Sequence, residues 1–571
     1  MAAVFAIIAY ITTGVVSAVE AIAYLQTVLP RGWEVDQATA SIGLLFFFCL
    51  LTNLGIKESA VFAKVIFCIH VVVLTLLSIL GTMHMIYKPD LLYENWETPY
   101  PLVKIHSQAT GSVEIESFHF VEGGIWTALF FGFSSAMLGV SGFETSSQFV
   151  EEQAPGVFPK TLRNMWVGVM VFNPLLSLIS FSALEMSEIV SHTDTVLART
   201  AHVVGHWVQT ELALPESYNL GPAFSTLVSV DAFIVLAAAL LTSFIGINGL
   251  IRRMSMDRCL PQFLLVQNPC TGTDSFILVG FFLLCVSQVL VFDTNVAALG
   301  GVYCYAFLAV MIIFAIGNML LKVKRPSLPR EVTVGWIHAI LGFVSVVIAL
   351  MGNVLGKPEL LTFFFIYVFI VGALVFAMFQ RVTIVRLLYK LIRRSRKKLA
   401  VNAEDYDGNQ DDDASIVSQS TYNTYDMVDE EARLLSNKSN KGCLASLSRT
   451  LKKFQNVPFI FFCKHDDVHL LNKAILYIQR NEQTNKIIIV HCANQTDTAM
   501  LAEHVKLMDL LYPKTKISLL IIESPFTPAV IEWTSQALRV PVNAMFISCP
   551  DENFAMKVNQ LRGMRIITAY D

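Results

Sequence analysis

Charged residues are scarce in this 571-residue chain, at 15% of the total compared with about 25% in typical soluble proteins. Apolar residues reach 54%, and the mean hydropathy is +0.57. A soluble fold would have too little polar surface to cover this much hydrocarbon, so most of the chain is expected to face lipid. The net charge of −4 and the lack of a dominant basic stripe exclude nucleic acid as a leading partner.

The sequence also lacks paired cysteines. Its ten cysteines are scattered singly, without CxxC pairs or metal-ligand spacing. We therefore expect reduced thiols in apolar surroundings, no disulfide framework, no metal site and no cofactor. A signal peptide is not expected either, because the first apolar stretch has no basic segment before it and no small-residue cleavage site.

The hydropathy pattern changes abruptly after about Arg381. Before this point, ten apolar stretches predict a membrane domain over residues 1–385, and most are long enough for the ~20 residues that cross a bilayer. The second stretch is short and gives the weakest prediction. The predicted spans cover residues 3–28, 39–54, 60–87, 125–145, 162–184, 223–250, 275–293, 297–321, 334–355 and 359–380.

Loop charges predict the orientation of these spans, because cytoplasmic loops carry an excess of Lys and Arg. With a cytoplasmic N-terminus, the outer loops carry only Arg31, Lys88, Lys104, Arg199 and Lys357. The inner loops then carry Lys57, Lys64, Lys160, Arg163, Arg252, Arg253, Arg258, Lys322, Lys324, Arg325 and Arg330. Both termini are therefore expected in the cytoplasm. In the outer loop after the fifth span, Val196 to Val208 predicts a further helix.

The part after the last span is expected to be cytoplasmic and to contain two regions. Residues 386–456, first basic and then acidic, predict a disordered linker, because this composition buries too little apolar surface to fold. Residues 457–571 alternate continuous apolar runs with helical patterns, which predicts an α/β domain with a parallel sheet covered on both faces. The expected strands cover residues 458–463, 486–493, 517–524, 544–550 and 565–568, and the expected helices cover 467–482, 497–511 and 527–539.

Two short patterns in the linker have the form of membrane-sorting signals. Tyr425 and Val428 have the spacing of a tyrosine-based signal, and Glu430 precedes the pair Leu434 and Leu435 as in an acidic dileucine signal. An adaptor protein binds such motifs as extended peptides. The alternative is that the leucine pair begins a short helix that packs on the terminal domain. The membrane is accordingly expected to be the plasma membrane or an endosomal or vacuolar membrane.

Ionisable residues inside spans are functional candidates, because they are costly in lipid. Glu20 and His70 lie within the first and third stretches and are candidates for binding a coupling ion. The structural alternatives are a carboxyl group bonded to a neighbouring helix and a core histidine with its hydrogen bonds satisfied. Asp231, at the start of the sixth stretch, is expected near the membrane interface.

The fourth stretch is unusually rich in glycine and hydroxyl residues between Phe131 and Ser147. Small residues allow close helix packing, which is one explanation. The spacing Gly139-x-x-Gly142, followed by Phe143 and Glu144, favours the other explanation, a broken helix. The freed backbone groups of a broken helix bind a substrate near the membrane midplane.

Three motifs resemble those of the amino acid–polyamine–organocation (APC) superfamily of permeases. The first joins Gly142-Phe143-Glu144 to Glu151-Glu152 and to Phe158-Pro159-Lys160-Thr161-Leu162-Arg163. The others are Asn53-Leu54-Gly55-Ile56-Lys57-Glu58-Ser59-Ala60 and Arg253-Met254-Ser255-Met256-Asp257-Arg258-Cys259-Leu260-Pro261. The resemblance covers residues 1–385, with the three motifs in family order. It places Gly142 in family helix 6, so that the first span resembles helix 3 and helices 1 and 2 are missing.

This resemblance implies a multi-pass α-helical protein with the LeuT-like APC fold. The implied function is secondary active transport, by proton- or sodium-coupled symport, of amino acids or related organic cations through alternating access, with no enzymatic activity. The implied substrate groups are Gly139, Ser141, Gly142, Phe143 and Glu144. His70 is the implied proton site, and Thr242 and Ser243 are the alternative sodium ligands.

The terminal α/β domain resembles universal-stress-protein-like domains. Cys549-Pro550-Asp551-Glu552 follows its fourth strand in place of a glycine-rich phosphate loop, so a regulatory or dimerising role, with a homodimer through this domain, is expected rather than nucleotide binding. Two alternatives to amino acid transport stay open. One is a carrier resembling the cation–chloride cotransporters, and the other is a membrane sensor or scaffold that does not transport.

Overall fold

The computed structural model divides the chain into two compact units, Met1–Ser255 with Leu260–Val375 and Met256–Cys259 with Phe376–Asp571. Each unit is described by itself. The residues that the structure describes are 2–30, 33, 35–55, 60–97, 103–106, 113–116, 124–143, 146, 153–154, 156–324, 333–380, 383–387, 390–391, 457–464, 466–482, 484–492, 499–548, 558–561 and 563–567.

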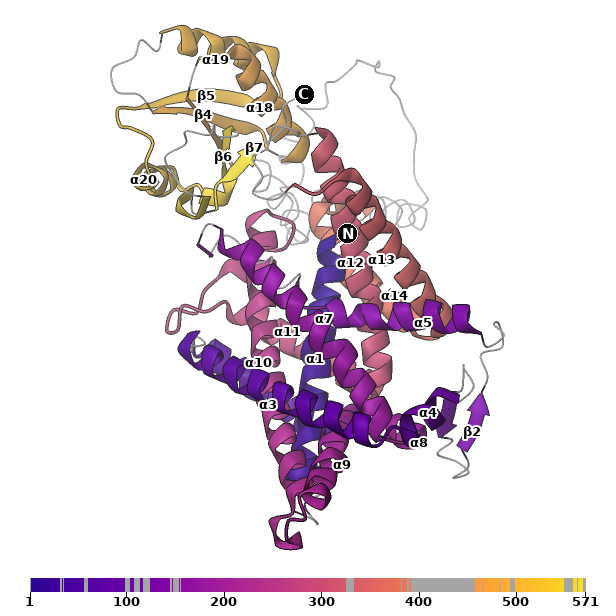
Figure 1. The fold of residues 1–571 in the computed structure, drawn as a ribbon. Coiled ribbons are helices and arrows are strands. Elements are labelled where there is room, and N and C mark those ends of the chain that lie inside the picture. Colours follow the sequence, from indigo (N-terminus) through magenta and orange to yellow (C-terminus); the bar gives the residue numbers. More distant parts are fainter. Residues whose placement is uncertain are drawn as a thin grey trace, which may run out of the picture. The chain divides into compact units, whose positions relative to one another are not determined.

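The first unit is a bundle of helices (Figure 1). Its long helices are α1 (Ala2–Val28), α2 (Gln37–Asn53), α3 (Ala60–Tyr87), α7 (Val157–Ala183), α10 (Leu220–Met256), α11 (Ser275–Phe292), α12 (Val296–Lys324), α13 (Trp336–Gly356) and α14 (Leu360–Phe379). Shorter elements are α4 (Asp90–Glu97), α5 (Ile125–Ala136), the 3-10 helix η1 (Met137–Val140), α8 (Met186–Ser191) and α9 (Val196–Glu211). Strands β1 (Val103–His106) and β2 (Val113–Glu116) pair antiparallel.

Each of the ten predicted spans contains a helix, but the helices are not all long enough to cross a membrane. Eight helices among the described residues are long and apolar enough to cross a membrane. Two further apolar helices, Gln37–Asn53 and Ile125–Val140, are shorter. The first of these is the stretch that gave the weakest prediction. The second is short because helical geometry ends at Val140 and Ser141 is extended, so one continuous helix does not fill the expected span 125–145.

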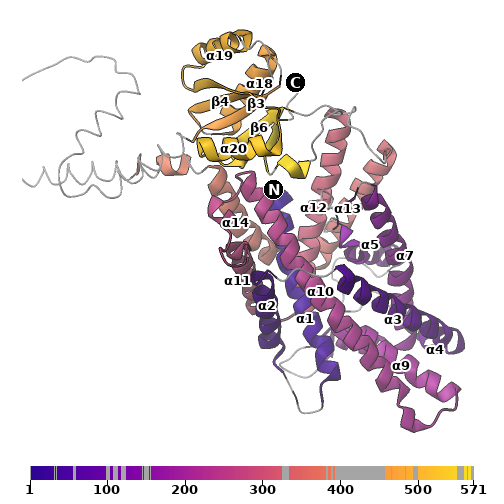
Figure 2. The ribbon, with the colours of Figure 1, turned by 90° about the vertical axis from the view of Figure 1, so that its left-hand side faces the viewer.

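Helix α1 lies inside the bundle (Figures 1 and 2), where it packs against α12, α2 and α11. In its most apolar 18-residue segment 67% of the residues are buried, compared with 11% in α13. Small residues make this possible, since a side chain at Gly14 would lie 3.3 Å from the ring of Phe281. The hydroxyls of Thr12 and Thr13 donate to the carbonyls of Ile8 and Ala9, which satisfies them within the helix.

The predicted helix from Val196 to Val208 is confirmed as α9. It packs against α3 and α7 rather than standing free at the surface. A buried apolar cluster joins it to α3, α7 and α10, and the members of the cluster are Val73, Leu77, Leu176, Ala201, Val204, Phe224 and Val228.

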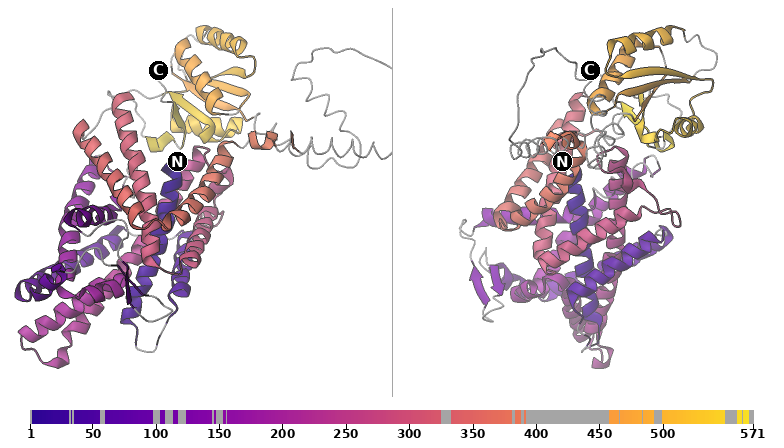
Figure 3. Two further views of the ribbon diagram at one scale, coloured as in Figure 1. Left: turned by 90° about the vertical axis from the view of Figure 1, so that its right-hand side faces the viewer. Right: turned by 180° about the vertical axis from the view of Figure 1, so that it is seen from behind.

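The second unit contains a five-stranded parallel sheet in the order β5-β4-β3-β6-β7, as the α/β pattern predicts. The strands are β3 (Phe459–Cys463), β4 (Lys486–Cys492), β5 (Lys516–Ile522), β6 (Met545–Ser548) and β7 (Arg565–Ile567). The helices are α18 (Val468–Asn481), α19 (Ala499–Leu511) and α20 (Pro528–Leu538), and α19 and α20 lie on opposite sides of the sheet (Figures 1 and 3). All five residues of β3 are buried, because it is the central strand and is covered on both faces.

Cysteines in the described ranges are free thiols. They are Cys49, Cys68, Cys259, Cys270, Cys285, Cys304, Cys463 and Cys492. In the second unit, burial raises the pKa of Cys492 to about 11, so this thiol stays protonated and unreactive at neutral pH.

Candidate substrate cavity

The fourth predicted span leaves helical geometry at Ser141, next to the glycines at which the sequence predicts a break. α5 ends at Ala136, η1 continues to Val140, and Ser141 is extended with φ −63° and ψ 156°. Gly142 follows with φ +99°, a conformation that side chains with a Cβ atom rarely adopt.

Two asparagines from neighbouring helices donate to carbonyls around this break. Asn353 on α13 donates its Nδ2 to the carbonyl of Ser134 at 2.8 Å and to that of Ala349 at 2.9 Å. Asn173 on α7 donates to the carbonyl of Gly139 at 3.4 Å. A Cβ atom at Gly139 would lie 2.7 Å from this amide nitrogen, so a larger residue there would displace the Asn173 side chain.

A cavity of about 650 Å³ lies next to the interruption, between α1, α5, η1, α12 and α13. This volume is in the range of small-molecule sites in proteins. Its walls are formed by Thr13, Val16, Ser17, Glu20, Phe131, Ser135, Leu138, Ser141, Val296, Ala297, Gly300, Gly301, Tyr303, Cys304, Gly352, Asn353, Gly356 and Lys357.

The cavity combines an apolar wall with a small set of polar groups. Hydroxyls come from α1, from α5 and from the extended Ser141, and an amide comes from Asn353. Two ionisable side chains of opposite type line it, the carboxyl group of Glu20 and the amine of Lys357. Within the described ranges, neither side chain makes an ion pair or a side-chain hydrogen bond, so both are available to a ligand.

Two of the sequence-predicted site residues, Ser141 and Glu20, meet in this cavity. Gly139, Gly142 and Phe143 adjoin Ser141 along the chain but do not form its wall. Glu144 lies outside the described residues, and so do the linker residues Tyr425, Val428, Glu430, Leu434 and Leu435.

His70 lies elsewhere, at the contact between α3 and α10. Its Nδ1 is 2.7 Å from Oδ2 of Asp231, and the Asp231 side chain is only 6% exposed. Asp231, which the sequence predicts near the membrane interface, lies eleven residues after Leu220, the first residue of α10, and is a buried partner of His70.

The predicted sodium ligands do not line the cavity. The hydroxyl of Thr242 donates to the carbonyl of Ala238 at 2.9 Å, and that of Ser243 donates to the carbonyl of Ala239 at 3.0 Å. Both hydroxyls therefore satisfy their donor groups within α10.

Several wall residues were missed by the sequence interpretation. Among them, Thr13 and Ser17 share one helix face with the predicted Glu20 at the i, i+4, i+7 spacing, so this polar stripe was readable from the sequence. Asn353 and Lys357 show a similar spacing on α13, but nothing in the sequence indicates that this face meets α1.

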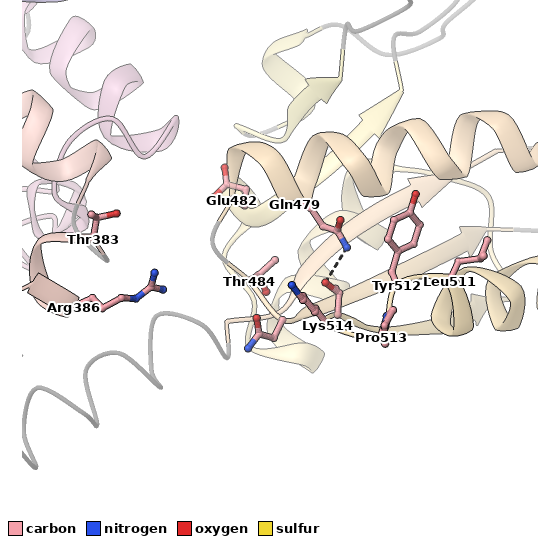
Figure 4. A pocket seen from close by; sticks show the side chains of 11 residues that line it. Thr383, Arg386, Gln479, Glu482, Thr484, Leu511, Tyr512, Pro513 and Lys514 are labelled. Carbon is pink, nitrogen blue, oxygen red and sulfur yellow. Dashed lines mark hydrogen bonds between the residues drawn. The ribbon is translucent and has the colours of Figure 1, made fainter. Parts of the chain in front are cut away.

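A second cavity, of about 430 Å³, lies in the second unit (Figure 4). Within the α/β domain its wall comes from the end of α18 and from the segment that leads into β5. Its polar groups partly satisfy one another, since Gln479 donates to the hydroxyl of Thr515 at 3.0 Å. Glu482 is paired with Arg565 at 2.5 Å. This arrangement does not indicate a particular ligand.

A comparison with known protein families shows the family to which the chain belongs. A model described as "Amino acid permease" matches residues 1–376, about two thirds of the chain. The chain belongs to the amino acid permease family. The permease is therefore an integral multi-pass membrane protein that transports amino acids, and it is not an enzyme. No curated protein matches it.

Proposed function

We propose that the permease moves amino acids by alternating access around the cavity between α1, α5, η1, α12 and α13. The observation that carries this proposal is the coincidence of the interrupted helix with a cavity that contains polar groups. Backbone that leaves helical geometry at membrane depth is tolerated where it lines a water-filled or ligand-filled space. Ser141, extended and on the cavity wall, belongs to such a segment.

The proposed orientation has both termini in the cytoplasm, following the excess of basic residues in the inner loops. In this orientation α1 and α13 run outward and α12 runs inward. The cavity residues Glu20 and Lys357 then belong to the outward ends of α1 and α13, and Val296 belongs to the outward end of α12.

For the coupling ion we propose a proton bound by the pair of His70 and Asp231. The pair joins two membrane-spanning helices, and the ordinary pKa of histidine is close to neutral. Thr242 and Ser243 stay the alternative sodium ligands, because their hydroxyls donate to carbonyls of their own helix and keep their oxygen lone pairs for a cation.

A counterflow experiment tests the transport function. The purified full-length protein is reconstituted into liposomes loaded with a mixture of unlabelled amino acids, and entry of radiolabelled amino acids is measured. We expect transient accumulation of label, because exchange through an alternating-access carrier is driven by the internal pool. Liposomes without internal amino acids are the control. Label that never exceeds equilibration in loaded liposomes would favour a sensor or scaffold.

The α/β domain has a surface suited to a second copy of this chain, the edge of β5. In the described part of the sheet, β5 pairs only with β4, and Lys516 donates its N–H toward β4. Because successive peptide groups alternate, those of Ile517, Leu519 and Ile521 face outward. Asp509 accepts the N–H of Ile517 at 2.7 Å, which leaves the groups around Leu519 for a partner strand.

We propose that two copies pair antiparallel across a twofold axis with Leu519 opposite itself. The N–H and C=O groups of Leu519 then bond reciprocally, and the N–H of Ile521 bonds to the C=O of Ile517 in the second copy. The same pairing covers the side chain of Ile521, which is 42% exposed.

Replacing Ile521 with lysine should weaken this dimer at least about tenfold, because a charged side chain on an edge strand opposes pairing. The measurement is the concentration dependence of the mass of the full-length protein in detergent, by light scattering. Trp533→Lys is the control, since Trp533 is 55% exposed on α20, away from the edge. Equal effects of both substitutions, or a monomeric parent protein, would contradict the pairing.

A further inference from the structure

Two ionisable side chains of the cavity indicate how an amino acid is held there, and this inference rests on the proposed transport function. Glu20 on α1 and Lys357, just after α13, both line the cavity, and no ion pair among the described residues joins them. Among the described residues of the wall there is no other Asp, Glu, Lys or Arg. The wall therefore offers one acidic and one basic group, and neither neutralises the other.

The backbone of Lys357 is fixed at the cavity by hydrogen bonds. Its N–H donates to the carbonyl of Asn353 at 3.1 Å, and its carbonyl accepts from the hydroxyl of the buried Tyr305 at 2.6 Å. The side chain of Asn353 in turn donates to the carbonyl of Ser134, beside the interrupted helix. These bonds hold the end of α13 in place, while the flexible four-carbon side chain of lysine can reach a ligand.

Glu20 ends a polar face of α1 that also contains Thr13 and Ser17. The hydroxyl of Thr13 already donates to the carbonyl of Ala9 at 2.8 Å. Glu20 has no such partner among the described residues, and a carboxylate at membrane depth is unfavourable unless it is paired. A ligand ammonium group next to Glu20 would remove this penalty.

Every free amino acid carries the two complementary charges, an α-ammonium and an α-carboxylate on the same carbon atom. A zwitterion of this kind can pair with an acidic and a basic wall group at the same time. Val16, Phe131, Leu138 and Val296 form an apolar part of the wall, which remains for the side chain.

We propose that Glu20 binds the α-ammonium group and that Lys357 binds the α-carboxylate of the transported amino acid. The ammonium group donates hydrogen bonds to the carboxylate of Glu20, and the α-carboxylate accepts from the ammonium group of Lys357. The cavity accordingly prefers zwitterions to amines without an α-carboxylate and to acids without an α-ammonium group. Either analogue leaves one wall group unpaired.

Analogues that lack one α charge test this assignment with the purified full-length protein. An amino acid amide keeps the ammonium group and replaces the carboxylate with a neutral group of similar shape. An α-hydroxy acid keeps the carboxylate and replaces the ammonium group with a hydroxyl. Each set of analogues competes with the radiolabelled amino acid mixture used for counterflow, so the result does not depend on which amino acid is preferred. We expect both sets to compete at least about tenfold more weakly than the unlabelled amino acids.

Two variants remove one charge each and should change the preference in opposite ways. In Lys357→Gln, the amides should compete within about a factor of three of the amino acids, while the hydroxy acids stay about tenfold weaker. Glu20→Gln should show the reverse pattern. Glu20→Asp and Lys357→Arg keep the charges and should keep both preferences. Glu211→Gln and Lys88→Gln are matched controls, because both residues are exposed, one at the end of α9 and the other just after α3.

The outcomes separate this inference from the proposed function. Amides and hydroxy acids that compete as well as amino acids against the parent protein would overturn the inference and leave amino acid transport intact. Both preferences persisting in Glu20→Gln or in Lys357→Gln would overturn the role of that residue. Loss of binding in a variant that keeps the charge would assign the residue to packing and also overturn its role. Absence of amino acid binding by the parent, together with absent counterflow, would overturn both proposals.

Discussion

Replacing Gly142 with leucine is expected to reduce amino acid uptake at least about tenfold while the protein still inserts in the membrane. At φ +99°, Gly142 occupies a conformation that costs a residue with a side chain about 1–3 kcal/mol. Space is not the limiting factor, because the nearest atom to an added Cβ is the Cε of Met165, at 3.9 Å. The variant relieves its strain by moving the backbone, and Ser141 then leaves the cavity wall.

The measurement is the initial rate of radiolabelled amino acid uptake in proteoliposomes, normalised to the amount of inserted protein. Gly132→Leu is the matched control, since Gly132 lies on the same interrupted span, has no atom near an added Cβ and needs no positive φ. Gly142→Ala should also lose activity, because alanine suffers the same backbone strain. Full activity of both Gly142 variants would show that the interruption only packs helices.

Replacing His70 with glutamine should remove most of the pH dependence of uptake between about pH 5 and pH 8. In the parent protein, protonation of His70 completes an ion pair with the buried Asp231, and deprotonation leaves a buried carboxylate next to a neutral ring. If this proton is carried with the substrate, uptake in the parent should rise about tenfold as the outside pH falls through the range in which histidine titrates.

Glutamine cannot take up this proton, so the rate of the variant should be nearly constant over that range. The measurement is uptake against external pH, with and without sodium. His202→Gln is the control, because His202 is exposed on α9. Asp231→Asn should act like His70→Gln, since either change removes one half of the pair. An unchanged pH profile with retained sodium dependence would transfer the coupling site to Thr242 and Ser243.

Much of the fold is determined by patterns that act locally along the chain. Each of the ten apolar stretches contains a helix. Lipid offers no hydrogen-bond partners, so the backbone of such a segment must satisfy its own N–H and C=O groups, as a helix does. In the second unit, Phe459–Cys463 and Lys486–Cys492 contain continuous apolar runs. A strand with one face in water would alternate apolar and polar residues, so these runs predict strands that are covered on both faces. The break at Ser141 and Gly142 was also readable, since glycine at 139 and 142 weakens a helix.

The candidate site depended on which helix faces meet, and only the tertiary structure decided that. Glu20, Asn353 and Lys357 are far apart in sequence and line one cavity because α1, α12 and α13 pack together. Likewise, the sequence does not indicate which residue pairs with His70. Asp231 is its partner because α3 and α10 meet in the folded protein. Residue type and spacing decide whether a segment is a helix, whereas the pairing of charges depends on packing between distant segments, which the local pattern does not encode.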